Sequence, residues 1–166
     1  IFFGYFYTAG PYALAYTGLA DIIAFLFFGP IAVSGTYYIQ HLTVSFESIL
    51  LGVGVGLLAT ALLSINNIRD QEEDKQVNKK TLVVRFGQTF GFIEYSLCIV
   101  ISTSILWILS YSIIMIYVLL AYTIFCMHMI RKTLTASKIQ LNTCLSGTGL
   151  TLFLYPLIYG IRYIIN

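Results

Sequence analysis

The sequence predicts an all-α membrane protein with five transmembrane helices. Its 166 residues are 58% hydrophobic with a mean hydropathy of +0.87. Only 10% are charged, against about 25% in soluble domains, so a soluble fold would lack the polar surface it needs. Apolar segments of spanning length also follow one another without the alternation typical of strands. The net charge of +2 is too small to indicate a nucleic-acid partner, and the partner that this composition indicates is the lipid bilayer.

A spanning helix needs about 20 mostly apolar residues. The first candidate contains Pro30, where we expect a kink, and the fifth contains Pro156. The third and fourth come from one run, 95–130, that has no Asp, Glu, Lys or Arg. At about 1.5 Å per residue this run is too long for one span, so we expect a break near residues 110–112. The five expected spans are about 19–38, 48–66, 89–109, 113–130 and 141–163, with a charged loop at about 67–88.

The basic residues predict an orientation, because cytoplasmic loops collect Lys and Arg. Eight of the nine basic residues fall in the two loops that precede the third and fifth spans, and Arg162 alone lies on the other side. We therefore expect an integral protein of a bacterial cytoplasmic membrane with the charged loop on the cytoplasmic side. The chain opens with IFFGYFY and no Met, which indicates the C-terminal portion of a longer membrane protein.

The charged loop holds most of the charge in the chain. Nine of the sixteen Asp, Glu, Lys and Arg residues lie between Arg69 and Arg85. Asn66, Asp70 and Asp74 are spaced four residues apart, so on a helix continuing beyond the second span they would share one face. Carboxylate and amide oxygens suit hard cations such as Mg²⁺. No Cys or His belongs to the group, which disfavours zinc.

Cations surround this stripe of oxygen ligands. They are Arg69, Lys75, Lys79, Lys80 and Arg85. A divalent ion combined with Lys and Arg is how proteins neutralise a diphosphate, so the pattern indicates a metal–diphosphate site. From spacing alone, a plain solvated loop explains the same charges slightly better, and Glu72 and Glu73 are expected to be solvated in either case.

Two stretches of the chain resemble one family. N-N-I-R-D-x-x-x-D from Asn66, followed by K-x-T-L-V-V-R-F-G, resembles the second aspartate-rich motif of the UbiA superfamily of intramembrane prenyltransferases. Y-T-A-G-P-Y-A-L-A-Y-T-G-L-A-D (7–21), followed by F-L-F-F-G-P-I-A-V-S-G-T-Y-Y, is similar to the 1,4-dihydroxy-2-naphthoate prenyltransferases of menaquinone synthesis. The resemblance covers most of the chain, and the last two spans match loosely.

The resemblance implies a bundle of nine transmembrane helices around a central cavity, with two aspartate motifs facing each other at the cytoplasmic rim. The five spans would be helices five to nine. The first aspartate motif lies earlier in the family and is absent from this chain, so we expect the chain to hold one half of a two-part metal site.

The resemblance also implies the reaction and the roles of the charged residues. Asp70 and Asp74 would be the catalytic pair and hold Mg²⁺ against a polyprenyl diphosphate, with Asn66 or Asn67 helping. Lys79, Lys80, Arg69 and Arg85 would contact the diphosphate, and Lys75 is a weaker candidate. An aromatic quinone precursor would then attack the allylic carbocation. The expected acceptor is 1,4-dihydroxy-2-naphthoate, which would lose its carboxylate and yield demethylmenaquinone; 4-hydroxybenzoate and homogentisate are the alternatives.

Four tyrosines precede the first span, and they are Tyr5, Tyr7, Tyr12 and Tyr16. Aromatic faces stabilise cations, so they are candidates for the acceptor or carbocation pocket, although an interfacial aromatic belt explains them as well. Asp21, at the start of the same span, is either a first-turn acid that favours the helix N-terminus or a substrate contact.

The remaining signals favour structural roles. Gly52 and Gly56 form a G-x-x-x-G within an apolar span, which indicates close helix packing rather than nucleotide binding. The three cysteines lack any C-x-x-C spacing and are expected to be buried, and His41 and His128 are expected to be structural. A transporter is disfavoured because the spans hold almost no ionisable residues, and a purely structural subunit would leave the asparagine–aspartate stripe unexplained.

Overall fold

Every long element in the part of the chain that the structure describes is a helix. The computed structural model describes residues 18–109 and 113–165, apart from the side chains of Ile114 and residues 163–165, and it has no strand among them. Five of its helices are long and apolar enough to cross a membrane, which confirms the predicted fold class. The elements are α2 (Ala20–Leu26), η2 (Phe27–Ile31), α3 (Ala32–His41), α4 (Phe46–Arg69), α5 (Gln71–Gln76), α6 (Leu82–Phe86), α7 (Gln88–Leu109), α8 (Ile113–Leu134) and α9 (Lys138–Ile165).

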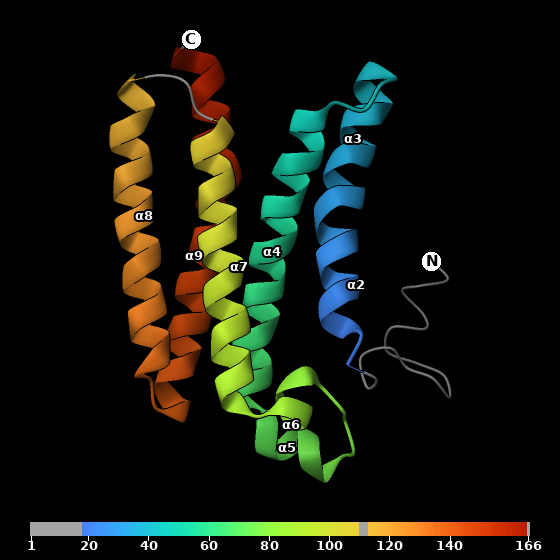
Figure 1. Cartoon of the computed structure of the whole chain (residues 1–166), viewed down its shortest axis with the longest axis vertical. Helices are drawn as coiled ribbons and strands as arrows, with labels where there is room; N and C mark the ends of the chain where they lie inside the picture. Colours follow the sequence, from blue (N-terminus) through green and yellow to red (C-terminus); the bar gives the residue numbers. More distant parts are fainter. Residues whose placement is uncertain (1–17, 110–112, 166) are drawn as a thin grey trace.

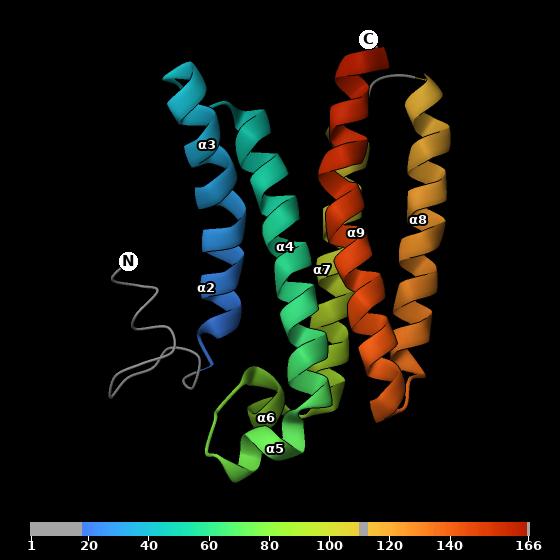
Figure 2. The same cartoon turned by 180° about the vertical axis from the view of Figure 1, so that it is seen from behind.

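Helix α4 is the centre of the bundle. It lies between α2 and α7, and α9 packs on it from another side (Figures 1 and 2). Leu58, Ala61 and Ile65 of α4 are fully buried, and so is Tyr95 of α7. The Tyr95 hydroxyl lies 3.0 Å from Thr148 Oγ1 of α9. A hydrogen bond between apolar helices satisfies polar groups that lipid cannot, so it helps to hold α7 and α9 together beside α4.

The first span bends where Pro30 was expected to bend it. α2 and α3 are joined through the π-helical turn η2, in which Gly29 departs from helical geometry with φ −106° and ψ −108°. Proline restricts the residue before it, and glycine tolerates the resulting conformation. The bend places Gly29 against α4, where a Cβ on Gly29 would lie 2.6 Å from the Gly52 carbonyl oxygen and 2.6 Å from Gly56 Cα. The packing role predicted for Gly52 and Gly56 is thereby confirmed.

Replacing Gly29 by alanine is expected to lower the free energy of unfolding by about 1–3 kcal/mol, because overpacking forces two backbones apart. Chemical denaturation of the purified protein in detergent measures the change. Gly35→Ala is the matched control, because a Cβ at Gly35 in the same span meets nothing within 4 Å. Alanine is the better helix former, so the control should leave stability unchanged or slightly higher. Equal stabilities of the two variants would contradict the close α2–α4 contact.

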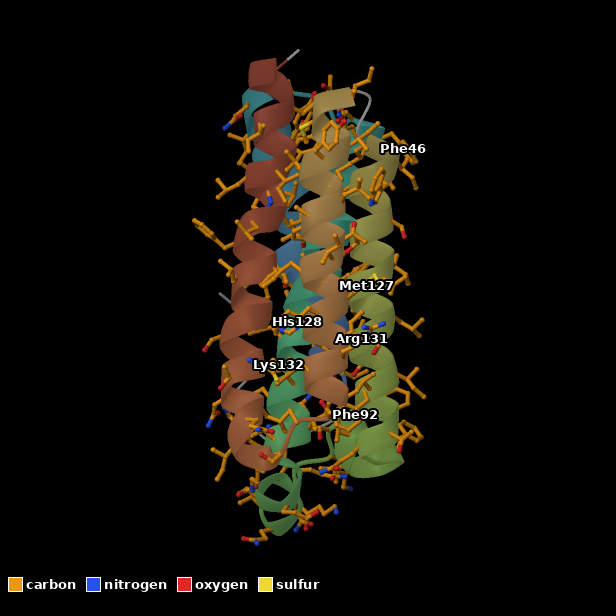
Figure 3. All side chains as sticks on the ribbon, turned by 90° about the vertical axis from the view of Figure 1, so that its left-hand side faces the viewer. Phe46, Phe92, Met127, His128, Arg131 and Lys132 are labelled. Carbon is orange, nitrogen blue, oxygen red and sulfur yellow. The ribbon has the colours of Figure 1, made fainter. Side chains whose placement is uncertain are left out.

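The cysteines are buried, and the two histidines are exposed on α3 and α8. Cys98, Cys126 and Cys144 are free and buried, as predicted. The His41 ring stacks on Tyr37 at 4.2 Å between ring centroids. His128 is exposed on α8, close to Arg131 and Lys132 at the end of the helix nearest α5 and α6 (Figure 3).

Candidate functional site

The charged segment covers the ends of α4 and α7 that lie beside the start of α2 (Figure 1). α4 ends at Arg69, and Asp70 adopts φ −95° and ψ 10° between α4 and the short helix α5. The continuous helix expected here is therefore interrupted. The Asp70 N–H still donates to the Asn66 carbonyl at 3.0 Å, and the Asp74 N–H donates to the Asp70 carbonyl at 2.8 Å. Both steps of the stripe therefore keep the backbone hydrogen bond that joins residues four apart in a helix.

Arg69 joins three of the polar groups at this rim. Its Nε and Nη2 donate to the two carboxylate oxygens of Asp70 at 2.6 and 2.7 Å. Nη2 also donates to Asn66 Oδ1 at 2.6 Å, and Nη1 donates to Asn142 Oδ1 of α9 at 2.9 Å. A guanidinium bound to both carboxylate oxygens gives strong, directional hydrogen bonds. Two members of the predicted metal stripe are therefore brought together by a predicted phosphate ligand.

The charge on Asp70 is stabilised by its neighbour. The hydrogen bond from Arg69 holds the pKa of the Asp70 carboxyl below its usual value of 3.8, and the charges of Lys79 and Lys138 act in the same direction. Asp70 therefore stays ionised at neutral pH. A carboxylate in this state attracts cations, and Arg69 already binds both of its oxygens.

Asp70→Asn is expected to lower the free energy of unfolding at pH 7 by at most about 1 kcal/mol, because the ion pair with Arg69 is partly solvated. The pKa of Asp70 is lower in the folded state than in the unfolded state, so its ionised carboxylate stabilises the folded protein above pH 3.8. This contribution is lost as the pH falls through the folded-state pKa. Thermal unfolding in EDTA at pH 7 and at pH 3 measures the difference between wild type and variant. A difference of equal size at both pH values would contradict the assignment.

Asp74 is the most buried acid of the charged segment. It is 7% exposed, and Lys79 Nζ lies 3.1 and 3.0 Å from its two carboxylate oxygens. The Lys79 N–H also donates to the Asp74 carbonyl at 2.9 Å. The turn after α5 therefore folds back so that one lysine covers the second predicted metal ligand.

The other predicted cations lie further out. Lys75 pairs with Glu72 at 2.7 Å, both exposed, and Lys138 pairs with Glu73 at 2.6 Å. Arg85 Nε donates to the Lys80 carbonyl at 3.1 Å. Glu72 and Glu73 are exposed as expected, each with a lysine partner. Arg69 and Lys79 therefore stand out because each contacts an aspartate of the stripe directly.

Asn66 and Asn67 lie on different sides of α4. Asn66 binds Arg69 at the rim, whereas Asn67 is 1% exposed and its Nδ2 donates to Asp21 Oδ1 at 3.3 Å. Asp21 lies in the first turn of α2 and is 3% exposed. Asn66 and Asn67 were both expected as possible metal ligands, and these contacts favour Asn66.

Glu94 was missed by the sequence reasoning. It lies in α7, where its Oε2 accepts a hydrogen bond from the Ser64 hydroxyl of α4 at 2.8 Å. A single acid within an apolar span is itself a signal of function, and it could have been read from the sequence. Asp21 and Glu94 also weaken the argument against a transporter, which counted the spans as nearly free of ionisable groups.

An apolar groove lies beside α4 next to the rim. It has a volume of about 440 Å³ and is lined by Ala24, Phe28, Ala59, Leu62, Leu63, Asn66, Leu145 and Leu152. A separate hollow of about 510 Å³ lies between α3, α4 and α9 toward the other end of the bundle. Among the described residues that line the groove, Asn66 has the one polar side chain, so the apolar groove meets the charged rim at that residue.

The donors of the stripe fit Mg²⁺ in their chemistry. Among the residues that the structure describes, no three His, Cys, Asp or Glu side chains gather as a metal site. Mg²⁺ typically takes one or two carboxylates and fills its other positions with water and phosphate oxygens. Asp70 and Asp74, with the Asn66 oxygen, supply that limited set. Tyr5, Tyr7, Tyr12 and Tyr16 lie outside the described residues, so their expected role stays a prediction.

Comparisons with known proteins agree on one family. The model of the UbiA prenyltransferase family matches residues 1–157. The 1,4-dihydroxy-2-naphthoate octaprenyltransferase of Haemophilus influenzae is 42% identical over 107 residues, 64% of this chain and 34% of that protein. The Escherichia coli protein of the same name is 46% identical over 82 residues, 49% of this chain and 27% of its own length. A 2-carboxy-1,4-naphthoquinone phytyltransferase from Synechocystis is 34% identical over 91 residues, 55% of this chain and 30% of that protein.

These matches cover about a third of each relative or less. No solved structure matches the chain.

Proposed function

This chain belongs to the UbiA prenyltransferase family, and we propose that the whole protein transfers a polyprenyl group from polyprenyl diphosphate to 1,4-dihydroxy-2-naphthoate. The observation that carries the proposal is the apolar groove that ends at Asn66, where Arg69 and Asp70 begin the charged rim. A polyprenyl diphosphate has the matching form, with a long apolar tail and an anionic head. The names of the similar proteins supply the acceptor.

Binding of the donor follows from the two parts of the site. Burial of a polyprenyl tail in the groove is favourable because it removes apolar surface from water. Arg69 and Lys79 bind the diphosphate oxygens, with Lys80, Arg85 and Lys75 further out. Both inner cations are held beside the aspartates in the structure, so they are oriented before the diphosphate arrives.

Asp70, Asp74 and Asn66 are the residues that would hold Mg²⁺. When bound there, the ion would add positive charge that stabilises a departing diphosphate. Arg69 and Lys79 share that role with their own charges. Asn67 is assigned to Asp21 rather than to the metal, because its amide donates to that carboxylate.

The transfer joins a carbon of the acceptor ring to the prenyl group. The allylic C–O bond of the donor breaks and its electron pair leaves with the diphosphate. The ring carbon that bears the carboxylate attacks the resulting carbocation and a C–C bond forms at that carbon. Loss of the carboxylate as CO₂ returns its bonding electrons to the ring, restores aromaticity and gives demethylmenaquinone in its reduced form. The apolar walls of the groove exclude water that would otherwise capture the carbocation.

The test is a transfer assay on membranes that carry the full-length protein, with labelled polyprenyl diphosphate and each acceptor in turn. We expect Mg²⁺-dependent product with 1,4-dihydroxy-2-naphthoate and release of CO₂. Product formed instead with 4-hydroxybenzoate or homogentisate would show that this compound, and not the naphthoate, is the acceptor. Absence of transfer to all three would contradict the proposed function.

The rim is proposed to face the cytoplasm. Arg131 and Lys132 lie toward the end of α8 nearest α5 and α6 (Figure 3), and Lys138 pairs with Glu73 of α5. Arg162 pairs with Glu47 near the start of α4, at the opposite end of the bundle. This distribution matches the bias of basic residues toward cytoplasmic loops. Labelling of a single cysteine introduced at Val77, from each side of sealed vesicles, tests the orientation.

A further inference from the structure

A third, smaller cavity is separate from the groove and the hollow described above, and α2 and α4 line it as well. It has a volume of about 150 Å³ between α2, α4, α6 and α7. Its walls combine two carboxyl side chains and one hydroxyl with apolar side chains, and the lining residues are Asp21, Ile22, Phe25, Leu57, Thr60, Leu82 and Glu94. The donor groove uses neither acid, so both acids are unexplained by donor binding.

Asp21 lines this cavity and has one buried carboxylate oxygen that is unsatisfied. Its Oδ1 accepts from Asn67 Nδ2 at 3.3 Å, whereas its buried Oδ2 has no hydrogen-bond partner among the described residues. Thr60 Oγ1, in the same wall, donates to the Asp21 backbone carbonyl at 3.4 Å and not to the carboxylate. Buried polar groups are nearly always hydrogen-bonded, and an unpaired one is costly. The free oxygen therefore calls for a donor from a ligand.

Glu94 supplies a second acceptor in the same cavity. Its Oε2 is held by Ser64 at 2.8 Å. A ligand that suits two carboxyl groups among apolar walls must offer hydroxyl donors on an apolar body. An aromatic ring with two hydroxyl groups has this chemistry. An anionic group, whether the diphosphate or the carboxylate of the ring, would be repelled by both acids and would have to lie outside the cavity.

The cavity lies beside the donor site. Asn66 lines the donor groove and its neighbour Asn67 binds Asp21, so adjacent residues of α4 serve the two hollows. A ligand in the cavity is thus close to the charged rim where the diphosphate is proposed to leave.

We propose that this cavity receives the hydroxylated ring of the aromatic acceptor, with the Asp21 carboxylate accepting a hydrogen bond from one ring hydroxyl and Glu94 accepting one from the other. This inference rests on the proposed function. Asp21 and Glu94 bind and orient the acceptor, and Asn67 and Ser64 are positioning residues that hold the two carboxyl groups. Hydrogen bonding to a carboxylate also raises the electron density of the ring, which favours attack on a carbocation.

Steady-state kinetics of the full-length protein in lipid nanodiscs test the inference. Wild type is compared with Asp21→Asn and Glu94→Gln, using 1,4-dihydroxy-2-naphthoate and its analogue 1-hydroxy-2-naphthoate, which lacks one hydroxyl. Wild type should favour the dihydroxy acceptor by about 10- to 100-fold in kcat/KM, as expected for a hydrogen bond to a charged group. At least one variant should lose most of this preference while the KM for polyprenyl diphosphate stays within about twofold.

A merely structural role would lower the amount of folded protein or kcat and leave the preference between the two acceptors intact, and that outcome would overturn the inference. Glu73→Gln is the matched control, because Glu73 is an exposed acid paired with Lys138, and it should keep wild-type preference and KM values.

Direct binding separates failure of the inference from failure of the proposed function. Anaerobic titration with 1,4-dihydroxynaphthalene, followed by its fluorescence, needs no transfer. Wild-type binding that is weakened about tenfold or more by Asp21→Asn supports the cavity even where no transfer to the naphthoate is found. Equal binding to wild type and to both variants overturns the inference even where transfer is robust.

Discussion

Asp74→Asn is expected to lower the transfer rate of the full-length protein by about 10²–10³-fold, the usual effect of removing one well-placed electrostatic group. Asparagine keeps the shape of the side chain and removes its charge. It would take one of the two carboxylates from the proposed metal ligands and leave Lys79, now 3.0 Å from an Asp74 oxygen, without its ionic partner. Initial rates with labelled polyprenyl diphosphate at saturating Mg²⁺ measure the effect.

The control for this experiment is Glu73→Gln, which removes an exposed acid from the neighbouring position and should keep the rate within about twofold. Asp70→Asn should resemble Asp74→Asn, and the double variant should be little slower than either single one, because residues that act as a unit are not additive. Near wild-type rates in both single variants, at normal protein levels in the membrane, would refute the metal assignment.

Lys79→Met is expected to lower kcat/KM for the polyprenyl diphosphate by about a hundredfold, and this is the second large effect. Methionine keeps much of the apolar stem and removes the charge that is proposed to bind the diphosphate. Its removal also leaves Asp74, 7% exposed, without the ammonium that neutralises it. The loss should appear in the donor kinetics, and the KM for the acceptor should change little.

Lys132→Met tests whether the loss of any positive charge would lower kcat/KM in the same way. Lys132 lies in the last turn of α8, away from the stripe, so its replacement should leave kcat/KM within about twofold. Lys75→Met should fall between the two, because Lys75 pairs with the exposed Glu72 and not with the stripe. Equal losses in the Lys79 and Lys132 variants would show a general effect of charge and contradict a specific contact.

Much of the fold follows from local patterns in the chain. The helices differ by a few residues from the expected spans: α4 runs from Phe46 to Arg69 where 48–66 was expected, and α7 from Gln88 to Leu109 where 89–109 was expected. Length and apolarity determine such segments because a membrane span must satisfy the hydrogen bonds of its own backbone groups. The kink before Pro30 follows equally from local sterics.

The candidate site could be predicted only in part. The spacing of Asn66, Asp70 and Asp74 identified the stripe, and their backbone hydrogen bonds keep that spacing. The break at Asp70 was not expected, because it depends on where the folded segment turns back to meet α4 and α7. Within the folded segment, α5 is also held to α6, because Gln71 Nε2 donates to the Val83 carbonyl at 2.9 Å.

The sequence by itself determined a helical membrane protein, the order of its spans, the proline kink and the one segment in which charge gathers. All of these depend on composition, local sterics and spacing along the chain. The tertiary structure alone decided that Asn67 meets Asp21, and that Ser64 meets Glu94 thirty residues away. These pairs depend on how α2 and α7 rest against α4, and a helical period places residues on a face without saying which helix that face will meet.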